Sequence, residues 1–164
     1  MECMIIKKKW LLISLLLISW STVPFIGMSS IKKYFPAALF MSLFVRGESV
    51  LAKKLRWWKF YEFLHPKTIG ETPLIWGPFI VGSMWILKWT YGKPLTFLLL
   101  NSIVHLLFVF PFYSVFKKLH IFSLVKLSRI GLFGLFFAKA ILMYIVQICV
   151  DFVRKKNEEN SSDY

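Results

Sequence analysis

Apolar runs close to the length of a membrane span constrain this chain more than any other feature. They cover residues 10–27, 34–52, 73–92, 94–116 and 130–150. A helix needs about 20 predominantly apolar residues to cross a hydrocarbon core of about 30 Å. The chain is 57% hydrophobic with a mean hydropathy of +0.63, far more apolar than a soluble domain of this length. The sequence therefore predicts an all-α membrane protein of about five transmembrane helices, forming a single domain over residues 1–153.

The first run has a second interpretation. It follows Lys7, Lys8 and Lys9, and a basic start before an apolar core is typical of a signal peptide. No A-x-A-like cleavage site follows it, and the sequence after Ser21 and Pro24 is again apolar. We therefore favour an uncleaved first span.

The longest polar connection, residues 53–72, mixes aromatic and basic side chains. Aromatic rings settle in the headgroup layer of a bilayer, where basic side chains also meet anionic lipid. We expect an interfacial amphipathic aromatic helix over about residues 55–64. The residues expected to act as its anchors are Trp57, Trp58, Lys59 and Tyr61.

The distribution of basic residues predicts the orientation. The formal net charge is +13, and the basic side chains gather in short clusters at the ends of the apolar runs. Anionic headgroups account for such clusters, so nucleic-acid binding is not predicted. With the N-terminus in the cytoplasm, twelve basic residues lie in inside segments and six in outside segments. The positive-inside rule then predicts a multi-pass protein of a bacterial inner (cytoplasmic) membrane, with its N-terminus cytoplasmic and its C-terminus outside. Residues 154–164 are expected to form a polar, disordered tail.

The stretch LFVRGESVL, residues 43–51, places Arg46 and Glu48 inside the second run. An ionisable group costs about 2.5 kcal/mol or more at mid-bilayer, so each one needs a partner or a task. These two are separated by about 200° around a helix and cannot pair with each other. His105 and Lys139 lie within about 2 Å of the midplanes of their spans. We expect the four residues to form an intramembrane polar cluster with a Glu48–Lys139 ion pair.

Three roles for these charges remain open. An ion pair that fixes helix packing is favoured, a solute or ion path lined by the four residues is the second, and snorkelling without a partner is the third. For His105 alone, a packing role with a hydrogen bond to Asn101, one turn away, is expected.

The sequence contains no motif that predicts catalysis. It lacks a G-x-S-x-G elbow, an H-E-x-x-H metal motif, a P-loop and a glycine-rich nucleotide fingerprint. Cys3 and Cys149 show no metal or disulfide spacing. We therefore predict no cofactor and no metal, and we favour a non-enzymatic protein over an enzyme; lipid-directed catalysis is the weakest alternative.

Three stretches carry a resemblance to other proteins: YFPAALFMSLFV, WWKFYEFLHPKTIGETPLIWGPFIVGSMWILKWTYG and FSLVKLSRIGLFGLFFAKAILMYIVQ. Across about residues 34–147 the chain resembles a family of small multispanning membrane proteins of unknown activity from spore-forming Firmicutes. The resemblance implies a multispanning inner-membrane protein and nothing about ligand or catalysis.

The function predicted from these observations is a non-enzymatic accessory or structural membrane component whose intramembrane charges fix helix packing. The alternative is a small transporter or channel-like protein using Glu48, His105 and Lys139, oligomeric because five short spans enclose little space. The expected partners are the bilayer with its anionic headgroups, and a second copy or another membrane protein.

Overall fold

A computed structural model describes residues 2–61 and 70–162, with residues 2–8 and 161–162 as backbone only. The described residues are mostly helical. The elements in chain order are α1 (Glu2–Ser21), α2 (Val23–Ile26), α3 (Met28–Leu55), β1 (Trp58–Phe60), α4 (Thr72–Leu74), η1 (Ile75–Phe79), α5 (Ile80–Thr90), α6 (Pro94–Leu107), η2 (Phe108–Phe112), α7 (Tyr113–Lys118), β2 (Phe122–Leu124) and α8 (Arg129–Ser162).

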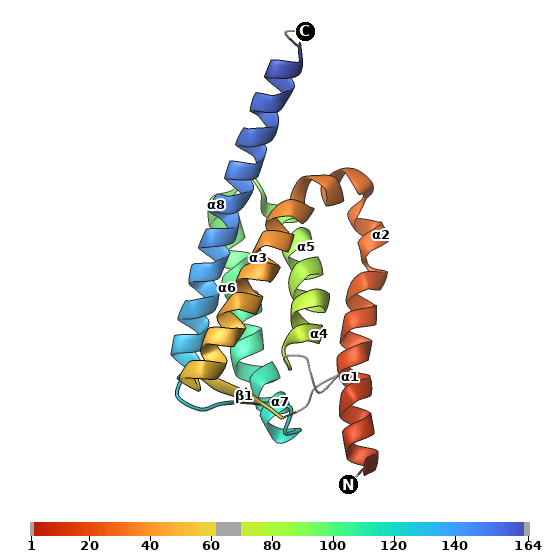
Figure 1. Cartoon of the computed structure of the whole chain (residues 1–164), viewed down its shortest axis with the longest axis vertical. Helices are drawn as coiled ribbons and strands as arrows, with labels where there is room; N and C mark the ends of the chain where they lie inside the picture. The colour runs from red at the N-terminus through yellow and green to blue at the C-terminus, as the bar shows by residue number, and fades with distance from the viewer. Residues whose placement is uncertain (1, 62–69, 163–164) are drawn as a thin grey trace.

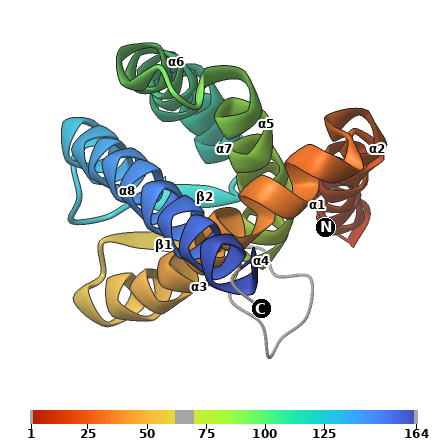
Figure 2. The same ribbon diagram turned by 90° about the horizontal axis from the view of Figure 1, so that it is seen from above.

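Helices α3, α5, α6 and α8 form a ring in which each contacts the next and α8 closes back onto α3 (Figure 2). Helix α1 lies outside this ring, against α4, η1 and α5. The long segments alternate in direction along the long axis, so the two termini lie at opposite ends of the molecule (Figure 1). The short paired strands β1 and β2 lie at the end of the molecule where the N-terminus is found (Figure 1).

Four helices are long and apolar enough to cross a membrane: Lys9–Ile26, Met28–Leu55, Pro94–Lys118 and Arg129–Asn160. They contain four of the five predicted runs, apart from a residue or so at the ends. The remaining run, 73–92, is helical through α4, η1 and α5, but it is not one of these four helices. Its tryptophans, glycines, prolines and Lys88 reduce its apolarity. A fifth span therefore stays a prediction.

The turn between the first two long helices is centred on Gly27. Gly27 has φ of +82°, a left-handed conformation that a side chain would disfavour. Pro24 occupies the first turn of α2, where its missing N–H leaves no helical bond unmade. These two residues turn the chain from α2 into α3 before Lys32.

Both π-helical segments are built around a proline. Pro78 lies within η1 and Pro111 within η2. Proline has no N–H and its ring collides with the preceding turn of an α-helix, and a wider π turn relieves that collision. Each segment continues directly into an α-helix, so the chain stays helical through the proline.

The predicted interfacial helix at about residues 55–64 is wrong over the described residues. Helix α3 ends at Leu55, and β1 pairs antiparallel with β2, with Trp58 opposite Leu124 and Phe60 opposite Phe122. The W-K-F order alternates apolar and polar side chains with the period of a strand, and this local pattern prevails over the helical interpretation. Residues 62–64 of that prediction lie outside the described residues.

The C-terminal tail is helical instead of disordered, since α8 continues through Ser162. Arg154 donates to the backbone carbonyls of Lys32 and Lys33, which fastens this extension to the start of α3. Lys155 and Glu159, one turn apart, form an exposed ion pair with an N–O distance of 3.9 Å.

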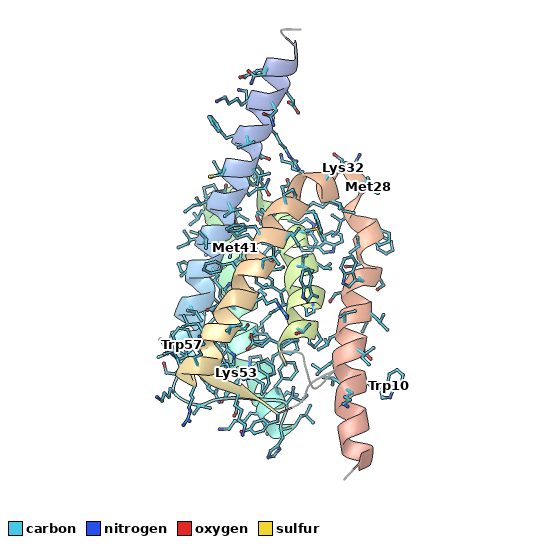
Figure 3. The ribbon with its side chains drawn as sticks, viewed as in Figure 1. Trp10, Met28, Lys32, Met41, Lys53 and Trp57 are labelled. Atoms are coloured by element: carbon cyan, nitrogen blue, oxygen red, sulfur yellow. The ribbon has the colours of Figure 1, made fainter. Side chains whose placement is uncertain are left out.

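The main core fills the space between α3, α5 and their neighbours. Met41 is fully buried there, with Ala37, Met84 and Leu87. Figure 3 shows Met41 on α3, within the bundle, and Trp10 projecting outward from α1. Trp10 is 63% exposed. The small alanine side chains of α3 let neighbouring helices approach closely, and the molecule's outer surface remains apolar.

Candidate functional site

The Glu48–Lys139 ion pair expected from the sequence is present. Nζ of Lys139 on α8 donates to Oε2 of Glu48 on α3 at 2.7 Å. The two side chains are only 9% and 11% exposed, for Lys139 and Glu48 respectively. The Lys139 ammonium also lies 4.5 Å from the ring centroid of Phe136. A buried charge is costly unless paired, so this contact links two helices of the ring at a defined register.

The pair lines a partly open cavity of about 250 Å³ between the helices of the ring. Its walls come from α3, α5, α6 and α8, and from both proline-centred π segments. Trp58, Phe60 and Phe122 of the two strands line it as well. The lining is predominantly apolar, with its polar groups concentrated in a few side chains. A single chain therefore forms a cavity between its helices, although the sequence led us to expect little space without oligomerisation.

Glu71 is the second acidic residue of this cavity. Its carboxylate accepts hydrogen bonds from the Ser49 hydroxyl on α3 and from the Trp58 indole on β1. Glu71 precedes α4, outside the spanning segments, and burial raises its pKa above the ordinary value of 4.5. The hydrogen bonds from Ser49 and Trp58 and the charge of Lys139 act in the opposite direction. These hydrogen bonds connect β1 and the segment before α4 to α3.

His105 faces the same cavity, but it is not bonded as expected. The side-chain amide of Asn101 donates to the carbonyl of Phe97 at 2.8 Å, not to His105. The Nε2 atom of His105 is buried and has no hydrogen-bond partner among the described residues. Its ring packs against Phe136 with centroids 5.4 Å apart. The predicted Asn101–His105 hydrogen bond is therefore wrong.

Arg46 does not join the other three residues. Its guanidinium is 3.4 Å from the Thr72 hydroxyl at the start of α4, and it does not line the cavity. The predicted four-residue cluster is thus three residues, Glu48, His105 and Lys139, with Glu71 added. The 200° separation of Arg46 and Glu48 around the helix accounts for this division.

The four predicted anchors have different environments. Trp58 points inward to Glu71 and the cavity, because residues of one strand face alternate sides. Lys59 is exposed, with its ammonium 5.1 Å from the ring of Tyr61. The exposed Tyr61 bonds Ser123 through its hydroxyl at 2.9 Å, and Trp57 packs beside Trp58. Trp58 is therefore not a lipid anchor in this structure.

An aromatic cluster lies between the helices at the end of the bundle opposite β1 and β2. Tyr34 contacts Tyr91, Tyr91 contacts Tyr144, and Tyr144 contacts Phe97. The Lys33 ammonium lies 4.8 Å from the Tyr91 ring centroid. These rings join α3, α6, α8 and the turn after α5. This aromatic cluster does not line the cavity, whose lining includes residues of both strands.

Sequence reasoning missed Glu71 and the inward role of Trp58. Trp58 was expected to be an interfacial anchor. The alternation of Trp58, Lys59 and Phe60 was the available signal for a strand with an inward tryptophan.

Comparison of the chain with protein-family models finds no match, and comparisons with curated proteins and with solved structures find none either. The resemblance to a Firmicutes family stays a prediction. The functional argument therefore depends on the geometry of this cavity.

Proposed function

We propose that this protein is a five-span membrane protein that serves as a non-enzymatic accessory or structural component, with the Glu48–Lys139 pair fixing its helix packing. The pair itself carries the proposal. It joins residues 91 positions apart in the sequence through one short, nearly buried contact. Such a contact defines both the order and the register of α3 and α8.

The outer surface supports a lipid environment. Large apolar side chains are exposed on every long helix, including Ile18, Leu43, Leu99 and Ile145. Monomeric soluble proteins rarely expose so extensive an apolar surface, whereas lipid tails solvate it. The alternating helix directions and the termini at opposite ends fit five crossings (Figure 1).

The proposed orientation is N-terminus cytoplasmic and C-terminus outside, in the cell membrane. The excess of basic residues in the proposed inside segments supports it. Anionic headgroups would then contact the basic residues at the end of the molecule that carries β1 and β2, and a second copy or another membrane protein would be the protein partner. A reporter fused after Tyr164 should be active outside the cytoplasm, and a cytoplasmic signal would contradict the five-span arrangement.

Single and paired substitutions test the structural role. Glu48→Gln removes the carboxylate that the buried Lys139 contacts directly, and we expect a loss of about 3–5 kcal/mol in unfolding free energy. Lys139→Met should have a similar cost, and the double variant should recover most of the folded yield. The exposed Lys155–Glu159 pair is a matched control on α8, since removing it should change stability by less than about 1 kcal/mol. Full stability of Glu48→Gln alone would contradict the proposal.

A small transporter or channel-like protein is the second candidate. The observation that favours it is the cavity between the helices, lined by Glu48, His105 and Lys139. If Glu48→Gln folds normally but abolishes a solute or proton flux in vesicles, this second candidate replaces the structural one.

A further inference from the structure

The geometry points to a ligand class for the cavity: a small hydrophobic organic cation, with an ammonium group on a compact apolar or aromatic body. This inference goes beyond the structural role proposed above. It names the substrate class if the transport candidate holds, but it requires binding only and no movement of solute.

The first argument is the balance of charge. Among the described residues that line the cavity, the ionisable groups are Glu48 from α3, Glu71 before α4, Lys139 from α8 and His105 from α6. Lys139 matches one carboxylate through its 2.7 Å contact with Glu48. Glu71 accepts hydrogen bonds from the neutral side chains of Ser49 and Trp58, and no cation among the described residues forms an ion pair with it. At a pH above the folded-state pKa of Glu71, and with His105 neutral, the described lining of the chamber carries one excess negative charge, which a monocation would balance.

The second argument is that the hydrogen-bonding groups left without partners in the cavity are acceptors. The protons of the Trp58 indole and the Ser49 hydroxyl are directed to Glu71 or to backbone, and Asn101 donates to Phe97. Acceptors remain: Glu48 uses only Oε2, and Nε2 of His105 has no partner among the described residues. A histidine nitrogen without a proton accepts a hydrogen bond. The chamber is therefore better suited to a ligand that donates than to one that accepts.

The third argument is the aromatic lining. Six aromatic side chains face the cavity, namely Trp58, Phe60, Phe79, Phe108, Phe122 and Phe136. Ring faces attract cations, and the effect is stronger where water is excluded. Lys139 already shows such a contact, with its ammonium 4.5 Å from the ring of Phe136. The same rings provide an apolar surface for the body of the ligand.

The cavity volume limits the size of the ligand. An apolar cavity of about 150 Å³ holds benzene, and typical drug-sized pockets begin at about 300 Å³. A volume of about 250 Å³ fits one aromatic ring with a short aminoalkyl chain. No group of three or more His, Cys, Asp and Glu residues that could hold a metal ion occurs among the described residues. The chamber's chemistry thus favours an organic cation.

Three probes of one shape test the inference: phenethylammonium, phenethyl alcohol and hydrocinnamate, which carry a positive charge, no charge and a negative charge. Binding would be measured by calorimetry with the full chain in zwitterionic lipid nanodiscs, after subtraction of empty nanodiscs. We expect the ammonium to bind about tenfold more tightly than the alcohol, and the carboxylate to bind most weakly. Equal or tighter binding of the alcohol or the carboxylate would overturn the inference, as would the absence of ammonium binding.

Variants locate the excess charge. Glu71→Gln should reduce the preference for the ammonium over the alcohol to about onefold while the alcohol still binds. Glu48→Gln combined with Lys139→Met removes a balanced pair, so the preference should persist. Glu158→Gln, which changes an exposed carboxylate on α8, is the matched control and should leave all three affinities unchanged. An unchanged preference in Glu71→Gln would refute the assignment.

Failure of this inference and failure of the proposed function are distinguishable. A protein that binds the ammonium but loses no stability in Glu48→Gln refutes the structural role alone. A protein that needs the ion pair for folding but shows no charge preference among the probes refutes the ligand class alone.

Discussion

Alanine at Gly77 tests whether α1 is held against the ring by close backbone packing. A Cβ atom at this position would lie 3.0 Å from the Cα atom of Leu16 on α1 and 3.5 Å from its Cβ atom. Favourable carbon–carbon contacts begin at about 3.5 Å. Because the obstructing atom belongs to the backbone, it cannot rotate aside, and α1 would have to move by roughly half an ångström.

The magnitude follows from two opposing effects. Overpacking costs about 1–3 kcal/mol, while alanine is favoured over glycine within a helix by about 1 kcal/mol. Gly77→Ala should therefore change the unfolding free energy by between about 0 and 2 kcal/mol, in the destabilising direction. Gly82→Ala is the matched control on the same helical segment, because a Cβ atom there meets nothing within 4 Å. It should stabilise the protein by up to about 1 kcal/mol.

Two measurements check this prediction. Denaturant or thermal unfolding in detergent should give Gly82→Ala a free energy of unfolding about 1–3 kcal/mol higher than that of Gly77→Ala. Spin labels at the exposed positions Ile18 on α1 and Trp89 on α5 should report an altered distance only in Gly77→Ala. Equal stability of the two variants, together with an unchanged distance, would refute the reasoning.

Three further predictions concern Glu71, His105 and Arg154. Because burial raises the folded-state pKa of Glu71 above 4.5, its contribution to stability is full below pH 4.5 and is lost as the pH rises through the folded-state pKa. The melting temperature in detergent should therefore fall as the pH rises through that range. If the same fall persists in Glu71→Gln, Glu71 is not its source. His105→Leu removes a buried nitrogen without a partner among the described residues, so the melting temperature should rise by the equivalent of about 1–3 kcal/mol, and a fall would contradict the assigned environment. Arg154→Gln removes the hydrogen bonds to the start of α3, so amide hydrogen exchange should quicken at the end of α8. Lys156→Gln is its exposed control, and equal exchange in the two variants would show that Arg154 does not hold the extension.

The ion pair was predictable because it depends on depth and helical rotation alone. Lys139 and His105 are the ionisable side chains of other runs nearest to Glu48 in depth, and Arg46 is turned away from Glu48 by the geometry of one helix. Both quantities follow from residue spacing. The pairing did not require knowledge of loop conformation.

The environment of Glu71 was not predictable by the same reasoning. Its carboxylate meets Ser49 and Trp58, which come from a helix and a strand separated from it in the sequence. Only the pairing of β1 with β2 turns Trp58 inward. The unpartnered nitrogen of His105 is likewise a tertiary result, because its neighbour Asn101 bonds its own helix backbone instead.

The amino-acid sequence by itself determined the long apolar helices and the pairing of Glu48 with Lys139, because hydropathy, helical period and the cost of an unpaired charge are local properties of each run. The ring order, the cavity and the excess carboxylate within it were decided by the tertiary structure. They depend on which helix faces which and on where the connecting segments fold back, and those choices reflect packing between residues distant in the chain.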